Sequence, residues 1–126
     1  MAQKFFKCEI CGNIIAMVEE SGVPIECCGQ EMTELTPNTS DGAQEKHVPV
    51  IAADGDLVRI SVGEISHPML PAHYIEWISI ETQQGNQRKL LAAGQEPSLE
   101  FALVPGDQLK AAYAYCNLHG LWKKEA

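Results

Sequence analysis

The stretch Tyr74-Ile-Glu-Trp-Ile-Ser-Ile-Glu81 decides the fold class, because its β-branched and aromatic residues favour an extended strand. The sequence Gln84-Gly85-Asn86 follows and is typical of a hairpin turn. Farther out, large apolar residues recur at every second position, Val58, Ile60 and Val62 in one stretch and Leu99, Phe101 and Leu103 in another, each stretch beside turn residues. Residues 109–115 fit a helix or a strand. Short strands separated by turn residues predict an all-β fold, a β-sandwich or a barrel.

The composition is that of an ordinary globular protein: 45% of the 126 residues are hydrophobic and 21% are charged. It excludes a disordered, collagen-like or coiled-coil chain. No run of about 18 apolar residues is present, so we expect no transmembrane helix. The start Met1-Ala2-Gln3-Lys4-Phe5-Phe6-Lys7 lacks the apolar stretch of roughly 7–15 residues that an export signal contains, so we expect a cytoplasmic protein.

The net charge argues against two classes of partner. Nine Lys and Arg residues oppose 17 Asp and Glu residues, giving a formal charge of −8. Such a charge repels nucleic-acid phosphates and anionic lipid headgroups. The basic residues are scattered along the chain and form no stripe. We therefore expect neither a nucleic-acid partner nor a membrane partner.

The chain is predicted to contain two domains, residues 1–36 and 37–126. The first contains a tight cysteine cluster and few residues that could form a core. A module of fewer than about 40 residues usually needs a metal or disulfides to fold. Residues 36–42 are rich in turn residues and read as the connection. Within the small domain, residues 14–18 and 24–25 flank Glu20-Ser21-Gly22, which predicts a hairpin.

The first candidate metal site has four cysteines. Cys8 and Cys11 form a C-x2-C pair, and the adjacent Cys27 and Cys28 follow. A tight turn can direct both sulfurs of the first pair at one ion, with Gly12 supplying a positive φ. The second pair can converge only with an unusual backbone. Tetrahedral sulfur ligation suits zinc or iron, so the metal stays open, and a vicinal disulfide at Cys27-Cys28 is a weaker alternative.

The second candidate site combines the four histidines with the last cysteine. The ligands are His47, His67, His73, His119 and Cys116. Five ligands are one too many for a structural zinc, whereas octahedral iron would keep one position open for a small molecule. A thiolate donates electron density to the metal and favours passing an electron to whatever binds there.

Two charged residues precede the first of these histidines. Lys46 can attract an anion by about 4 kcal/mol at ~4 Å and an effective dielectric of ~20, which offsets repulsion by the net negative charge. Glu45 can ligate or shield the oxidised metal. The alternative is that Glu45 and Lys46 are only solvated loop charges.

In this order the motifs resemble the desulfoferrodoxins, a family of two-iron superoxide reductases. The cysteine cluster of residues 8–28 is similar to the family's desulforedoxin-type iron site. The motifs that are similar to its catalytic iron site are Glu45-Lys46-His47-Val48-Pro49, His67-Pro68-Met69, His73-Tyr74 and Cys116-Asn117-Leu118-His119-Gly120. The resemblance implies a desulforedoxin-like (rubredoxin-like) Fe(Cys)4 domain, then an immunoglobulin-like β-sandwich with an Fe(His)4Cys site, and a homodimer.

The resemblance also implies a reaction. Ferrous iron with four equatorial histidines and axial Cys116 reduces superoxide by one electron, and hydrogen peroxide leaves after protonation. The lysine that matches Lys46 attracts superoxide and helps to deliver protons, and the glutamate that matches Glu45 binds the ferric iron. A donor such as rubredoxin reduces the iron again.

Two other functions compete with this one. In the first, the chain is a non-enzymatic electron carrier whose four-cysteine iron does the work. In the second, it is a zinc-stabilised binding module without iron.

Overall fold

Strands dominate both parts of the chain. The computed structural model describes residues 2–126 and separates into two compact units, with the boundary between Thr36 and Pro37. The helix α1 is short, Gln44–His47. The all-β prediction is confirmed. No helix within residues 2–126 has the length and apolar character needed to cross a bilayer.

The small unit contains five short strands in two sheets. A three-stranded sheet has the order β2-β1-β5, and β3 pairs with β4. The strands are β1 Phe5–Lys7, β2 Ile14–Ala16, β3 Glu26–Cys27, β4 Gln30–Glu31 and β5 Thr33–Glu34.

The hairpin predicted between residues 14–18 and 24–25 is wrong, because β2 pairs with β1 and residues 24–25 form no strand. The turn between β1 and β2 is the cysteine knuckle itself. There the N–H of Gly12 donates to the carbonyl of Cys8 (2.9 Å), and the N–H of Cys8 donates to the carbonyl of Asn13 (2.8 Å). The strand that pairs with β2 is β1, which the sequence analysis did not predict and which begins at the buried Phe5.

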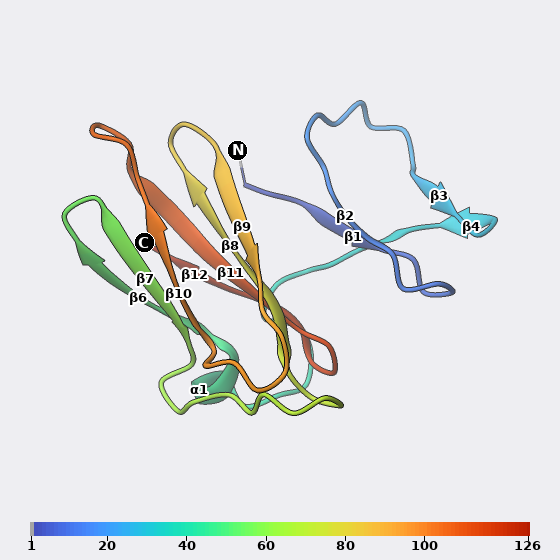
Figure 1. Cartoon of the computed structure of the whole chain (residues 1–126). Coiled ribbons are helices and arrows are strands. Elements are labelled where there is room, and N and C mark those ends of the chain that lie inside the picture. Colours follow the sequence, from blue (N-terminus) through green and yellow to red (C-terminus); the bar gives the residue numbers. More distant parts are fainter. Residues whose placement is uncertain (1) are drawn as a thin grey trace. The chain divides into compact units, whose positions relative to one another are not determined.

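The large unit is a sandwich of two antiparallel sheets (Figure 1). One sheet has the order β10-β7-β6 and the other β12-β11-β8-β9. The strands are β6 Pro49–Asp54, β7 Leu57–Val62, β8 Ile75–Thr82, β9 Asn86–Leu90, β10 Ser98–Ala102, β11 Leu109–Cys116 and β12 Gly120–Glu125. Residues 109–115 are therefore a strand, and β11 pairs on both sides.

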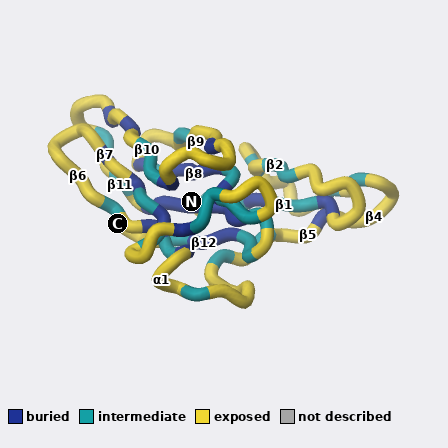
Figure 2. The backbone as a smooth tube through the Cα atoms, turned by 60° about the horizontal axis from the view of Figure 1, so that its bottom comes forward, coloured by how far each residue is buried: buried dark blue, intermediate teal, exposed yellow. Residues whose placement is uncertain are grey.

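The core lies between the two sheets. Val58, Ile60 and Val62 alternate along β7 with less buried neighbours, and all three side chains are fully buried. Ile78 and Ile80 of β8 belong to the same cluster. Figure 2 shows buried segments along the central strands. Burial of each such side chain contributes about 1.5–3 kcal/mol to folding, so the sheets form a stable scaffold.

Three irregular segments gather at one end of the sandwich (Figure 1). They are α1, the connection from β7 to β8 (residues 63–74), and the turn between β11 and β12 (residues 117–119). The backbone of Gly63 passes so close to α1 that an added Cβ would lie 2.6 Å from the carbonyl oxygen of Glu45. The segments are thus packed against each other.

Candidate metal centres

The predicted ligands come together in two groups. In each group the ligand atoms lie within 4.8 Å of one another. The thiolate group consists of Cys8, Cys11, Cys27 and Cys28, and the histidine group consists of His47, His67, His73, Cys116 and His119. All five cysteines are free, so no disulfide joins Cys27 and Cys28.

Two tight turns build the thiolate group. Gly12 has φ 83°, as the knuckle after Cys11 requires. In the adjacent pair, Cys28 itself takes φ 54°. This is the unusual backbone that the sequence predicts, and it brings the sulfur of Cys28 to 4.0 Å from that of Cys27. The sulfurs of Cys11 and Cys27 lie 3.7 Å apart.

The thiolate group has the electrostatics of a cation site. The N–H of Cys11 donates to the sulfur of Cys8 (3.5 Å), and this bond lowers the pKa of Cys8 to about 6. The neighbouring thiols raise the pKa of Cys28 to about 12. Four thiolates at these distances repel one another, and a metal cation removes the repulsion. Cys11 and Cys28 are exposed, whereas Cys8 is buried.

The histidine group lies at the irregular end of the sandwich. His47 ends α1, His67 and His73 lie between β7 and β8, Cys116 ends β11, and His119 lies in the turn before β12. His47, His67 and Cys116 are buried. Segments far apart in the sequence thus supply the five ligands from one end of a rigid scaffold.

Hydrogen bonds fix the tautomers of two histidines. The ring Nδ1 of His47 donates to the carbonyl of Ala43 (2.7 Å), and that of His67 donates to the carbonyl of Pro68 (2.6 Å). Each Nε2 atom therefore carries a lone pair, yet the two Nε2 atoms lie only 3.1 Å apart. Two acceptors at this distance cannot bond to each other. A shared cation resolves the contact, and the residues thus fit a bound metal.

Burial keeps three of the histidines in the form that binds a metal. It lowers the pKa of His67 to about 4, with the neighbouring histidines adding to the effect. It also lowers the pKa of His47 and His73. The rings are neutral at pH 7, and neutral imidazole is the form that binds a metal. Burial raises the pKa of the Cys116 thiol, although the N–H groups of Leu118 and His119 oppose the shift.

Trp122 of β12 contacts two ligands. Its ring stacks on that of His47, with 4.9 Å between centroids and 27° between planes. Its Nε1–H donates to the carbonyl of His119 (3.0 Å). Gly42 lies beside this pair, because a Cβ there would be 3.2 Å from both rings. Trp122 therefore holds His47 and His119 in place.

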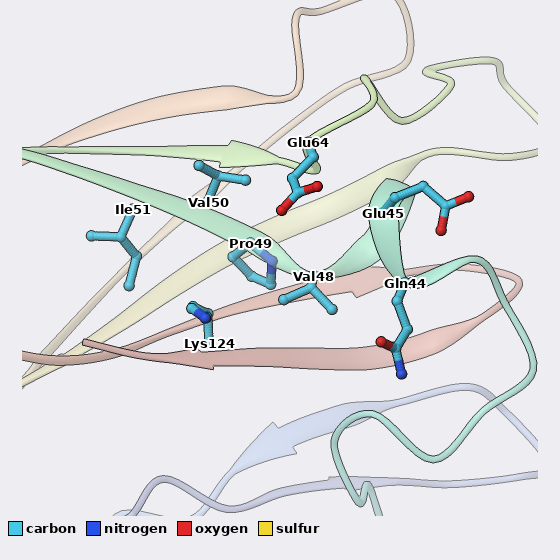
Figure 3. A pocket seen from close by; sticks show the side chains of 8 residues that line it. All are labelled: Gln44, Glu45, Val48, Pro49, Val50, Ile51, Glu64 and Lys124. Atoms are coloured by element: carbon cyan, nitrogen blue, oxygen red, sulfur yellow. The ribbon is translucent and has the colours of Figure 1, made fainter.

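Glu45 and Lys46 lie on α1 beside His47, and both are exposed. The charge of Lys46 lowers the pKa of His47 and His73, so it acts on the histidine group through space. Glu45 is outside the ligand cluster, and its side chain lines a groove along β6 that Lys124 of β12 also borders (Figure 3).

Two family profiles together match this chain over nearly its whole length. The sequence profile of "Desulfoferrodoxin" matches residues 39–125, and that of "Desulfoferrodoxin, N-terminal domain" matches residues 2–35. The chain belongs to the desulfoferrodoxin family. A desulfoferrodoxin homolog of Archaeoglobus fulgidus is 44% identical over 118 residues, which cover 94% of this chain and 93% of the relative.

Two further proteins match nearly the whole chain. The desulfoferrodoxin of Nitratidesulfovibrio vulgaris is 42% identical over 123 residues, covering 98% of this chain and 96% of the relative. The crystal structure of the superoxide reductase from Treponema pallidum aligns with a TM-score of 0.84 and 35% identity over 99% of this chain and 100% of that one. In this desulfoferrodoxin, both groups of residues can hold iron.

Sequence reasoning missed three residues that hold the histidine group. Trp122 lies outside every quoted motif, yet it contacts two ligands. Asn117 lies inside a quoted motif without an assigned role, and Gly63 lies outside every motif. The spacing of Cys116 and His119 places Asn117 between two ligands, and this was the one available signal.

Proposed function

We propose that this desulfoferrodoxin is a superoxide reductase, which converts superoxide, one electron and two protons to hydrogen peroxide. The observation that supports this most directly is the histidine group: four imidazoles and one buried thiol at one end of the sandwich. Bound there as Fe(II), iron would supply the electron and one open coordination position.

The protein's own residues have three tasks in this proposal. Lys46 attracts the superoxide anion, because its exposed ammonium group lies beside the histidine group. This local positive charge opposes the repulsion of the anion by the net charge of −8. Water held by Lys46 delivers protons to the product. Glu45, on the same helix turn, takes the place of the departing peroxide, which requires its exposed side chain to turn toward the histidine group.

The thiolate group has an accessory role in the proposal. Its exposed sulfurs, Cys11 and Cys28, form the side through which a rubredoxin-like donor exchanges electrons. Residues 1–36 are then the Fe(Cys)4 domain, and residues 37–126 are the catalytic domain. We further propose a homodimer in the cytoplasm, where a reducing environment keeps the five thiols free.

The test measures metal content, visible spectrum and superoxide consumption on one anaerobic preparation. We expect two irons per chain, a thiolate-to-iron absorption at the start, a second band on mild oxidation, and rapid consumption of pulsed superoxide without release of dioxygen. Release of dioxygen would indicate dismutation instead. Iron in the thiolate group alone, with slow superoxide consumption, would favour the electron carrier, and a colourless zinc protein would favour the binding module.

A further inference from the structure

The histidine ligands differ in what orients them. The rings of His47 and His67 are fixed by hydrogen bonds from Nδ1 to backbone carbonyls, and the carbonyl of His119 is bound by Trp122. The ring of His73 has no such bond to any group of residues 2–126, and its buried Nε2 is without a partner. Something other than a ring contact must therefore set the position of His73.

The side chain of Asn117 binds the backbone of the residues before and after His73. Its Oδ1 accepts a hydrogen bond from the N–H of Tyr74 (2.9 Å), and its Nδ2 donates to the carbonyl of Ala72 (3.0 Å). The backbone N–H of Asn117 also donates to the carbonyl of Tyr74 (3.2 Å). The amide therefore occupies the place that a neighbouring strand would take along residues 72–74.

This contact begins where the regular sheet ends. The pairing of β8 with β11 stops at Ile75 and Cys116, so no ladder hydrogen bond reaches His73. The turn that contains His73 closes on itself, with reciprocal bonds between Leu70 and His73 of 2.9 and 3.0 Å. These two bonds fix the shape of the turn and leave its position relative to Cys116 unset.

We propose that Asn117 is a positioning residue for metal binding: its amide fixes the backbone at His73 and so keeps this ligand within reach of the ion that Cys116 and His119 also bind. The inference rests on the proposed function, since it assumes that the histidine group binds iron. Partners of this kind orient metal ligands, and their loss typically lowers metal affinity by about 10–100-fold.

The chain offers a control in Asp107, just before the end of β11 that is opposite Cys116. Its Oδ1 accepts hydrogen bonds from the N–H groups of Gln84 (3.1 Å) and Gln108 (2.9 Å), so its side chain also binds backbone, and it touches neither a ligand nor Trp122 through these bonds. Asn38 makes bonds more like those of Asn117, but they flank Trp122 and therefore cannot serve as a control. Its Nδ2 donates to the carbonyl of Lys123 (3.1 Å), its Oδ1 accepts from the N–H of the same residue (2.8 Å), and its own N–H donates to the carbonyl of Leu121 (3.0 Å).

The first experiment compares iron release. Wild type, Asn117→Ala and Asp107→Ala are loaded anaerobically with ferrous ion, and a chromogenic chelator removes it while the absorption of the thiolate group serves as the internal reference. We expect Asn117→Ala to release the iron of the histidine group about 10–100-fold faster than wild type and to show a shifted ferric band. Asp107→Ala should match wild type in both. Equal release rates and bands in the two variants would overturn the inference.

The second experiment needs no metal. Hydrogen exchange of the Tyr74 N–H is measured in metal-free wild type and Asn117→Ala, and we expect about ten-fold or faster exchange in the variant. If wild type takes up no iron at the histidine group, the proposed function fails, while unchanged exchange at Tyr74 refutes the positioning role. Asn117→Asp keeps the acceptor for Tyr74 and replaces the alanine variant if that does not fold. The exchange rate of the Tyr74 N–H in Asn117→Asp should lie between those of wild type and Asn117→Ala.

Discussion

The N–H of Ile65 donates a 2.8 Å hydrogen bond to the carbonyl oxygen of Glu45, which ties the connection after β7 to α1. Gly63 lies at the same contact, and only the absence of a side chain allows the backbones to approach. The turn that carries Glu45, Lys46 and His47 is therefore positioned from β7, a core strand of the scaffold.

Replacing Gly63 with Ala should displace this turn. The added Cβ would lie 2.6 Å from the carbonyl oxygen of Glu45 and 2.9 Å from the carbonyl carbon of Lys46. Overpacking of this kind costs about 1–3 kcal/mol, and we expect the unfolding free energy and the rate with superoxide both to fall. Denaturant unfolding and pulsed-superoxide kinetics measure the two. Gly55→Ala is the control for the rate. Nothing lies within 4 Å of an added Cβ there, and its φ of 62° strains an alanine, so this variant should lose stability while its rate stays unchanged.

Lys46→Ala should slow the second-order reaction with superoxide by about ten-fold or more, which corresponds to at least ~1.4 kcal/mol. The reason is the loss of the cation beside the histidine group. The rate is measured across ionic strengths, and the wild-type rate should depend on salt more steeply than that of the variant. Lys110→Ala removes the same charge about 20 Å along β11 from Cys116. An equal effect at both lysines would contradict local attraction.

The two metal groups should be separable by single cysteine substitutions. Cys8→Ser should remove the thiolate-to-iron absorption of the small unit, because this buried sulfur is one of four ligands. Superoxide reduction with a chemical reductant should persist. Cys116→Ser should do the reverse, abolishing the reaction and leaving the first absorption intact. Loss of the reaction in Cys8→Ser would show that the thiolate group takes part in the chemistry.

Asn13 should tune the reduction potential of the thiolate group. Its Nδ2 donates to the sulfur of Cys27 (3.7 Å), which stabilises negative charge there and favours the reduced metal. In Asn13→Leu we expect the reduction equilibrium constant to fall by about two- to ten-fold, roughly 20–60 mV for one electron. A potentiometric titration gives both potentials at once, and that of the histidine group is the internal control. A shift shared by both groups would argue against a local effect.

Tyr113 should ionise at an unusually high pH. Burial raises the pKa of its phenol, the charge of Glu81 adds to the shift, and Lys123 opposes it. A folded-state pKa above the unfolded one means that this group contributes stability below about pH 10 and loses it as pH rises through the folded value. Ultraviolet titration should show a late phenolate transition that disappears in Tyr113→Phe and moves to lower pH in Glu81→Gln. A transition that survives Tyr113→Phe would assign it to another tyrosine.

The sequence predicts regular structure here better than it predicts irregular contacts. Alternation along residues 58–62 is visible because burial of one face repeats every second residue. The C-x2-C spacing points to a metal knuckle, but it does not reveal that this knuckle is also the hairpin turn between β1 and β2. That is why the other hairpin was predicted.

The residues that position the ligands cannot be recognised from the sequence around them. The bonds of Asn117 join residues 43 and 45 positions away, and those of Asn38 join residues 85 positions away. A side-chain amide that binds distant backbone has no periodicity to detect, and it depends on the completed sandwich. The ligands themselves were predictable, because cysteine and histidine side chains bind metals and can be recognised in the sequence by residue type alone.

Asn38 also affects how this chain behaves among other copies. Strand β12 is at the edge of its sheet, and an edge strand presents unpaired N–H and C=O groups to which a foreign strand can add. At Lys123 both of these groups are already bound by the Asn38 amide. The bonds of Asn38 thus interrupt the row of free backbone groups in the middle of the edge, so we expect them to disfavour the addition of another strand along β12.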